Sequence, residues 1–299
     1  MRQNRIKPAE GGVFHLTSRV VDRAMKLTDE EKDIFAGMMR RAERFSGVEI
    51  LAHCVMTNHF HILVRVPAAD ARVGEAELLD RYAALYGDAR RERLERAWAR
   101  LRGEGRAWKV EEAKARLLRR MHDVSEFAKT LKQRYSISYN RRHGRKGTLW
   151  EERFHSVLAE DVPAVLREIA AYIDLNPVRA RIVEDPSAYR WSGLGALARG
   201  DGAAASGYSA LLRGGSGPGD YVSMVSARAA SRLPRGRAPA PHPYAVARVR
   251  YFSYGGAIGG EGFVKRAGTG IACGTGNLLP GLCTARPLAG VAVHASLAK

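Results

Sequence analysis

Two strand-like segments separated by only two residues constrain the fold of this chain more than any other feature. Residues 48–56, VEILAHCVM, and residues 59–66, HFHILVRV, are rich in β-branched and aromatic residues, which favour strands. The break between them, Thr57-Asn58, has the length of a tight hairpin turn. We therefore predict that the two segments are antiparallel neighbours in one sheet.

Further elements lie on either side of this hairpin. Residues 13–20, VFHLTSRV, are another strand candidate, and Thr28-Asp29-Glu30-Glu31 has the composition of a helix start. Apolar residues recur at helical spacing over residues 34–39. Residues 148–159, TLWEERFHSVLA, predict a turn that leads into a fourth strand.

Helices are predicted between and after these strands. Residues 74–142 are highly charged and poor in turn signals, which suits two long helices. Asp161 is a natural N-cap, Pro163 follows in the first turn, and the apolar periodicity continues until Pro177 ends the helix. Together these elements predict an α/β (α+β) fold with a mainly antiparallel sheet and helices packed on it.

The composition changes along the chain and divides it into three parts. Residues 1–197 carry the strand and helix patterns and are predicted to form one domain. Residues 198–243 are rich in Gly, Ala, Ser and Pro, which predicts a linker or a loosely ordered segment. Residues 244–299 are predicted to be a small C-terminal segment with a poorly ordered tail, because no acidic residue follows Glu261 and the tail has no periodicity.

The net charge and the cysteine content indicate which kind of partner and which compartment suit this protein. The 299 residues include 49 Lys and Arg against 31 Asp and Glu, a formal net charge of +18, which indicates a polyanionic partner. The three cysteines have no CxxC spacing, so neither a zinc knuckle nor a disulfide framework is indicated, and a reducing cytoplasm fits. We recognise no signal peptide and no apolar stretch long enough to span a membrane.

Two histidines are placed to bind one metal ion. His59 and His61 lie in a predicted strand, where alternate side chains share a face, so both imidazoles lie on one side and Phe60 on the other. Such a pair is a candidate ligand set for a divalent cation such as Mg²⁺ or Mn²⁺. The structural alternative is a pair of surface histidines or of hydrogen-bonded core histidines.

A tyrosine and an asparagine lie one helical turn apart. Tyr172 and Asn176 are i and i+4 neighbours on one face of the predicted helix. A phenol has a pKa of about 10 and needs a nearby divalent cation or a base to become a nucleophile. Asn176 offers a neutral oxygen that could join the two imidazoles around such a cation. In the structural alternative, Tyr172 packs in the core and Asn176-Pro177 ends the helix.

Three motifs, taken in order, resemble one family. MTNHFHILV, GRKGTLWEERFHS and YIDLNPVRARIVEDPSAYRWSG are together similar to the REP-associated tyrosine transposases, members of the HUH single-tyrosine transposase superfamily. The resemblance covers roughly residues 8–196. It places the family's histidine pair on His59 and His61, its nucleophile on Tyr172 and its helix-borne polar metal ligand on Asn176.

The resemblance implies both a fold and a reaction. The implied fold is a ferredoxin-like sheet with the histidines on a central strand and the tyrosine on a helix packed beside it. In the implied reaction, the tyrosine attacks a phosphate of single-stranded hairpin DNA and leaves a 5′-phosphotyrosine link and a 3′-hydroxyl. The link conserves the bond energy, so the nick can be rejoined to another strand. The wider family includes monomers and homodimers.

The most basic stretch of the chain is the predicted DNA-binding surface. Its cations would neutralise phosphates and its tyrosines would stack on bases. The candidate residues are Lys129, Lys132, Arg134, Tyr135, Arg141, Arg142, Arg145 and Lys146. The structural alternative is a solvated helix face. Tyr135 and Tyr139, which are also one turn apart, compete with Tyr172 for the role of nucleophile.

Two other functions stay open from the sequence alone. A DNA-binding protein could recognise hairpins without cutting them, although such a protein has no physical reason to keep all four candidate site residues. A metallohydrolase could use the same histidines with water, although MTNHFHIL contains no carboxylate beside the pair. The charged segment 68–120 is long for a connection between a strand and a helix, and the motifs assign it no role.

Overall fold

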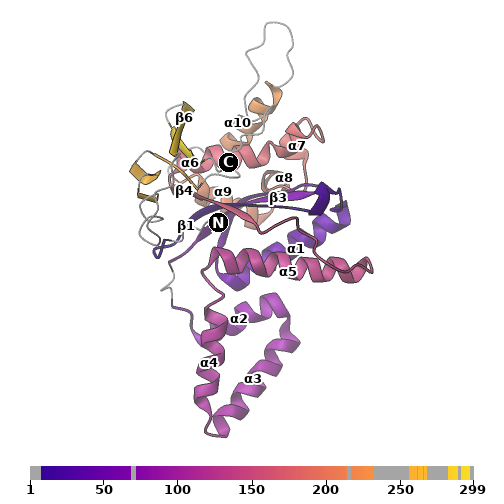
Figure 1. Cartoon of the computed structure of the whole chain (residues 1–299), viewed down its shortest axis with the longest axis vertical. Coiled ribbons are helices and arrows are strands. Elements are labelled where there is room, and N and C mark those ends of the chain that lie inside the picture. Colours follow the sequence, from indigo (N-terminus) through magenta and orange to yellow (C-terminus); the bar gives the residue numbers. More distant parts are fainter. Residues whose placement is uncertain are drawn as a thin grey trace.

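The computed structural model shows a central sheet between two layers of helices, with a separate helical extension (Figure 1). The structure describes residues 8–68, 72–213, 217–231, 256–260, 262–264, 266–267, 282–288 and 291–296.

The main sheet has five strands in the order β2-β3-β1-β4-β5. They are β1 (Gly12–Arg19), β2 (Glu49–Val55), β3 (His59–Val66), β4 (His155–Ala159) and β5 (Ala257–Ile258). β1 is antiparallel to β3 and β4, β2 is antiparallel to β3, and β5 is parallel to β4. The predicted hairpin of β2 and β3 is confirmed, and Met56 N donates to His59 O across its turn at 2.8 Å.

Two helices cover one face of this sheet. α1 (Asp29–Ser46) connects β1 to β2, and α5 (Val124–Arg142) precedes β4, which gives the β-α-β-β-α-β order of a ferredoxin-like fold. The Thr28 side chain caps α1 by accepting from Glu31 N, as the sequence predicts. Apolar side chains of both helices pack against the Phe60 side of β3. The predicted fold class, a mainly antiparallel sheet with packed helices, is confirmed.

A second set of helices covers the opposite face. One of them, α6 (Pro163–Asp174), packs on β2 and β3, and its side chains form one apolar cluster with Val13, Leu63 and Val157. The remaining elements of this half are α7 (Asn176–Arg179), α8 (Gly193–Ala198), α9 (Gly202–Leu211) and α10 (Pro218–Ala230), and short 3-10 helices occupy Val21–Arg23 and Pro186–Ala188. The sheet is therefore buried on both faces.

The predicted linker over residues 198–243 is wrong for the part that the structure describes. α9 and α10 bury Tyr208, Leu211, Tyr221 and Val225 in the same cluster as α6. The small residues that suggested a linker permit close packing instead, because a Cβ at Gly207 would lie 2.4 Å from Ile50 O of β2. Residues 214–216 and 232–243 lie outside the described residues.

α6 differs from the prediction at both ends. Val162 rather than Asp161 occupies the N-cap position, because Asp161 pairs with Arg65 of β3 at 2.8 Å. The helix ends at Asp174, and Pro177 lies in the first turn of α7, where proline is tolerated because its missing N–H has no helical partner to lose. Tyr172 and Asn176 therefore lie on two consecutive helices rather than on one.

Residues 75–118 form a three-helix arm that projects away from the sheet (Figure 1). Its helices are α2 (Glu75–Tyr86), α3 (Asp88–Gly103) and α4 (Ala107–Leu118), so the segment predicted to hold two long helices holds four with α5. Gly87 and Gly105, with φ of 87° and 70°, occupy the turns between them. The arm has its own small core, in which Leu78, Trp98 and Val110 pack with Phe45 of α1.

The tail that the sequence predicts to be poorly ordered contains two described strands. β6 (Leu282–Leu288) and β7 (Val291–Ser296) pair in a separate antiparallel sheet. Most of the predicted segment 244–265 lies outside the described residues, apart from the part that includes β5. None of the helices in the described part of the chain has the length and apolar character needed to cross a membrane.

His53 of β2 makes the stability of the fold depend on pH. Its side chain is buried, and burial, followed by the charge of Arg40, lowers its pKa from 6.5 to about 3. The unfolded chain binds a proton here below pH 6.5, whereas the folded chain does not until about pH 3. This contribution to stability is therefore present above pH 6.5 and is lost as the pH falls toward 3.

We expect the free energy of unfolding of the wild type, relative to a His53→Gln variant, to fall by about 3 kcal/mol between pH 7 and pH 4. Urea denaturation of both proteins at several pH values measures this difference. A difference that stays constant over the range would show that His53 has the same pKa in the folded and unfolded protein.

Candidate active site

The two predicted histidines lie on the face of the sheet that α6 covers. Side chains alternate along β3, so His59 and His61 share a face with Leu63, which packs in the cluster of α6. Phe60 points to the opposite face and packs with α1 and α5. β3 lies between β2 and β1, which places both imidazoles on an inner strand.

A third histidine, His15 of β1, joins this pair. It is fully buried, its ring stacks on His61 with centroids 5.1 Å apart, and its Nε2 lies 3.0 Å from His61 Nδ1. The motifs used in the sequence analysis did not single it out. The period-two pattern of VFHLTSRV puts His15 on the same face as Val13, but its meeting with His61 depends on a strand register that the sequence alone does not give.

Tyr172 lies against these rings from α6. Its ring centroid is 5.9 Å from that of His61 and 6.2 Å from that of His15, and both contacts are edge-on. α6 buries an apolar face that includes Val165 and Ile169, and Tyr172 continues this face at the end of the helix. The side chain is 1% exposed, so the phenol belongs to a packed cluster of aromatic and imidazole rings.

Asn176 closes the end of α6. Its Nδ2 donates to Tyr172 O at 3.1 Å and to Ile173 O at 3.0 Å, which satisfies carbonyls that the end of the helix leaves unpaired. The sequence-based alternative in which Asn176 ends the helix thus describes part of its role. The two donated bonds also fix the orientation of the amide, so that its oxygen is the atom suited to bind a cation.

Arg179 of α7 is a second neighbour of Tyr172 that the sequence analysis missed. Its guanidinium lies 4.3 Å from the centroid of the phenol ring, and its Nη2 donates to Tyr172 O at 3.0 Å. The i+7 spacing suggests a helical neighbour, but the break between α6 and α7 decides the contact. The guanidinium is permanently charged, and a positive charge beside the phenol can stabilise a phenolate or an approaching phosphate.

Asp174 connects the end of α6 to two neighbouring helices. It is fully buried and accepts hydrogen bonds from the hydroxyls of Tyr208, at 2.8 Å, and Tyr221, at 2.7 Å. Burial raises the pKa of Asp174 to about 7, although the two tyrosine hydroxyls oppose this shift. α9 and α10 supply these tyrosines, so the segment predicted to be a linker holds the end of the helix that carries Tyr172.

The histidines are held as metal-binding histidines usually are. His59 Nδ1 lies 2.7 Å from Asn58 Oδ1, an acceptor, so Nδ1 donates and Nε2 is the ring atom suited to bind a cation. His61 Nδ1 lies 3.0 Å from His15 Nε2, and the tautomers of the two rings decide which nitrogen donates. A polar partner on the second ring nitrogen fixes both the tautomer and the orientation of a ligating imidazole.

The donor set fits a divalent cation if Asn176 takes part. Among the described residues, no group of three or more His, Cys, Asp or Glu side chains is arranged to hold an ion. A cation held by His59 and His61 would therefore need a third protein ligand of another type. Two imidazole nitrogens and one amide oxygen suit a borderline or hard cation such as Mn²⁺ or Mg²⁺.

The structure divides the predicted DNA-binding residues into three groups. Lys129, Arg141 and Lys146 are exposed. Arg134, Arg142 and Arg145 donate hydrogen bonds to Leu85 O, to the Glu31 carboxylate and to Thr148 O, respectively. Lys132 and Tyr135 are buried, and Lys132 Nζ donates to Glu152 O at 2.8 Å. This burial leaves Lys132 and Tyr135 out of any surface that DNA could contact.

The two tyrosines that compete with Tyr172 for the role of nucleophile lie on the face of the sheet opposite the histidines. Tyr135 and Tyr139 pack in the cluster formed by α1 and α5, away from the face that carries the histidines. Tyr135 Oη donates to Glu31 Oε2 at 2.7 Å, and burial together with this bond raises its pKa above the usual value. Tyr172 is thus favoured over both as the tyrosine beside the imidazoles.

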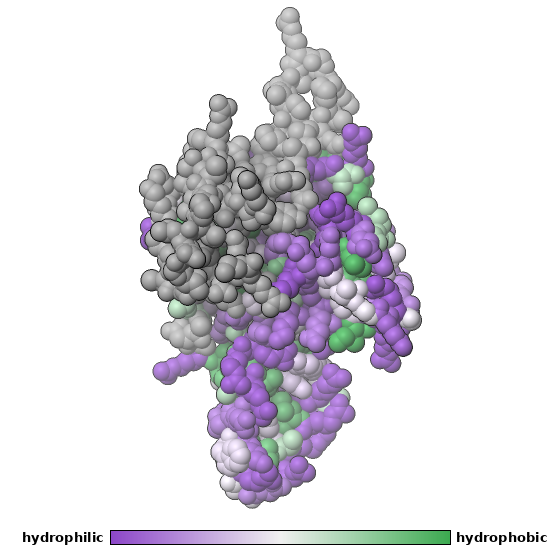
Figure 2. Space-filling model, in the orientation of Figure 1, coloured by the Kyte–Doolittle hydropathy of each residue, from purple (hydrophilic) through white to green (hydrophobic). Residues whose placement is uncertain are grey.

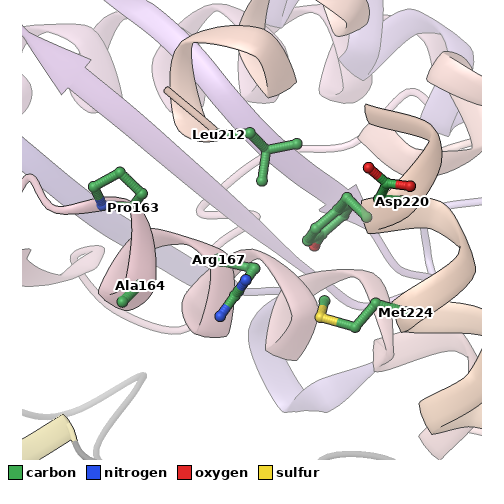
Figure 3. A pocket seen from close by; sticks show the side chains of 7 residues that line it. Pro163, Ala164, Arg167, Leu212, Asp220 and Met224 are labelled. Atoms are coloured by element: carbon green, nitrogen blue, oxygen red, sulfur yellow. The ribbon is translucent and has the colours of Figure 1, made fainter. Parts of the chain in front are cut away.

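Two hollows lie outside this cluster. One, of about 290 Å³, lies between α6 and α10 and is lined by side chains that include Arg167, Asp220 and Met224 (Figure 3). The other, of about 620 Å³, lies between the arm and α5. Neither is lined by the histidines or by Tyr172, so the candidate site is a packed junction of helix and sheet rather than part of these hollows.

Comparisons with known proteins leave the function to be argued from these residues. No protein-family model and no curated protein matches the sequence. The solved structure of a REP-associated tyrosine transposase bound to a REP hairpin is similar to this chain, with a TM-score of 0.42 and 18% sequence identity. The match covers 67% of this chain and 87% of the solved one. A similarity of this size does not by itself support an assignment.

Proposed function

We propose that this protein is a metal-dependent DNA transesterase of the transposase type, which cleaves single-stranded DNA beside a hairpin and rejoins it through Tyr172. The observation that carries the proposal is the contact of the Tyr172 ring with His61 and His15 on one face of the sheet. A phenol packed among imidazoles, with an arginine over its ring, is suited to nucleophilic attack on a phosphate.

The proposed chemistry conserves a phosphoester. Tyr172 Oη gives up its proton and forms a bond to phosphorus as the bond from phosphorus to the 3′-oxygen breaks, and the departing oxygen takes up a proton to become a 3′-hydroxyl, so that no net proton is gained or lost. The 5′-phosphate stays linked to the tyrosine. Attack by a 3′-hydroxyl of another strand reverses these changes and releases the enzyme.

Each residue of the cluster has a role in this reaction. His59, His61 and Asn176 would hold a divalent cation, which when bound polarises the phosphate and lowers the pKa of the phenol. His15 would fix the ring of His61 through the 3.0 Å contact. Because Tyr172 is 1% exposed, the phosphate reaches it only when a covering side chain moves, and Arg179 is suited to move toward the phosphate.

The wild-type reaction tests the proposal directly. A pool of labelled DNA hairpins with randomised single-stranded flanks is incubated with the protein and Mg²⁺ or Mn²⁺, and the products are separated on a denaturing gel. We expect a labelled band at the size of protein plus DNA, which disappears when EDTA is present. Recovery of the bound flank identifies the cleavage site.

Two results would contradict the proposal. Hairpin binding without an adduct, for every flank and both metals, would favour a DNA-binding protein that does not cut. Cleavage that yields two DNA products without any protein-linked species would favour a metallohydrolase that uses water.

A further inference from the structure

The groove between the arm and α5 is a concave surface lined by several cations. It is lined by Arg116, Arg119 and Arg120 at the end of α4, by Lys129 and Gln133 of α5, and by Tyr86 of α2. One acid also lines it, Glu126, which pairs with Lys129 at 3.1 Å. The space-filling view shows the arm as a largely hydrophilic surface (Figure 2).

Ion pairing distinguishes this groove from the rest of the arm. Elsewhere on the arm most cations have an acidic partner, as in the pairs of Arg81, Arg91, Arg96, Arg100, Arg102, Arg106 and Lys114. Within the described part of the chain, Arg119 and Arg120 form no ion pair, and Arg116 approaches Glu112 at 3.8 Å. Most cations elsewhere on the arm are thus compensated, whereas two of the cations that line the groove, Arg119 and Arg120, have no acidic partner among the described residues.

Arg120, which lines the groove, and its neighbour Arg134 are both held in place around Tyr86. The Arg120 guanidinium lies 4.8 Å from the Phe45 ring centroid, and its Nη1 donates to Tyr86 Oη at 2.7 Å. The Arg134 guanidinium lies 5.0 Å from the ring centroid of the same tyrosine. Side chains fixed in this way lose little conformational entropy when an anion binds.

Several arginine side chains lie close to Arg134. Burial, followed by the charges of Arg90, Arg41 and Arg120, lowers the pKa of Arg134, and Tyr86 opposes the shift. Arg90, Arg41 and Arg134 belong to α3, α1 and α5, and Arg120 follows the end of α4, so cations from three helices and one connection lie near one another. Close cations without acidic partners repel one another, and a bound polyanion relieves that repulsion by neutralising them.

We propose that this groove is a second DNA-binding site, which binds backbone phosphates of the nucleic acid on which Tyr172 acts. That the ligand is DNA rests on the proposed function, whereas the binding of phosphate rests on the arginines that have no ion pair. α5 covers the face of the sheet opposite α6, so the groove is separated from the candidate active site by the sheet. It supplies affinity along the DNA and takes no part in the chemical step.

Charge reversal at two exposed lining residues tests the groove. Fluorescence anisotropy of a labelled hairpin DNA is measured at several salt concentrations for the wild type and for an Arg116→Glu/Arg119→Glu variant. We expect the affinity at low salt to fall about tenfold or more and the slope of log K against log salt to fall by about 2. Arg96→Glu/Arg100→Glu is the matched control, because both arginines are exposed on the same arm outside the groove.

A gain of affinity provides a test that misfolding cannot imitate. Gln133 is exposed and lines the groove, so Gln133→Lys should tighten binding and raise the slope by about 1. An unchanged slope in both groove variants, or an equal loss in the control, would overturn the groove proposal. The covalent adduct formed by the groove variant is measured separately, at saturating DNA. A wild-type protein that binds DNA in this groove but forms no adduct would contradict the proposed reaction and still support the groove as a binding site.

Discussion

A Tyr172→Phe variant should form no covalent adduct with DNA, although its fold is kept. The substitution removes the nucleophilic oxygen and retains the ring that packs against His61 and His15. Loss of one buried hydroxyl costs about 1 kcal/mol in the free energy of unfolding, which thermal denaturation measures. The adduct should fall at least about 1,000-fold, because the proposal depends on this nucleophile.

Tyr139→Phe is the matched control for this experiment. Tyr139 is also a buried tyrosine on a helix, but it packs on the α1 and α5 side of the sheet. Its adduct level should equal that of the wild type. If Tyr172→Phe retains the adduct and Tyr139→Phe loses it, the active site lies on the face covered by α5, and the roles given to the histidines fall with it.

Local patterns were sufficient to predict the elements that surround the site. The two-residue spacing between β2 and β3 predicted their hairpin, and alternation in HFHILVRV predicted that His59 and His61 share a face. Both patterns depend on contacts between neighbours in the sequence, where backbone geometry leaves few options. The Thr28 cap of α1 was predictable for the same reason.

Contacts across the sheet were not predictable in this way. His15 meets His61 because of the register between β1 and β3, and that register is set by the whole sheet. Arg179 reaches Tyr172 because α6 stops at Asp174, which the periodicity of the sequence does not show. The residues that complete the candidate site are thus the ones whose positions depend on tertiary packing.

Composition misled the prediction in the segment after the candidate site. Small residues in α9 suggested a linker, but Gly207 is small because α9 packs directly on the backbone of β2. A Gly-rich and Ala-rich segment is compatible either with a linker or with a closely packed helix, and the tyrosines within it distinguish the two. Tyr208 and Tyr221 are large, buried and bonded to Asp174, which is typical of a packed core rather than a linker.

A His61→Ala variant should lose both cleavage and stabilisation by metal while it keeps its affinity for DNA. His61 contacts Tyr172 and His15, so its removal takes away a proposed cation ligand and one wall of the phenol's environment. Mn²⁺ at 100 times its Kd should stabilise the wild type by about 2.7 kcal/mol and leave the variant unchanged, as measured by thermal unfolding. The adduct should fall at least about 1,000-fold.

Hairpin affinity should stay within about twofold of the wild type, because phosphate contacts elsewhere on the protein supply it. His155→Ala is the matched control, since His155 alternates onto the same face of the sheet from β4 and its Nε2 lies 2.6 Å from Glu152 Oε1. Equal losses of adduct in the two variants would mean that any histidine on this face affects the reaction through packing. Equal stabilisation of His61→Ala and wild type by Mn²⁺ would place the cation elsewhere, and Tyr172 would then need another means of activation.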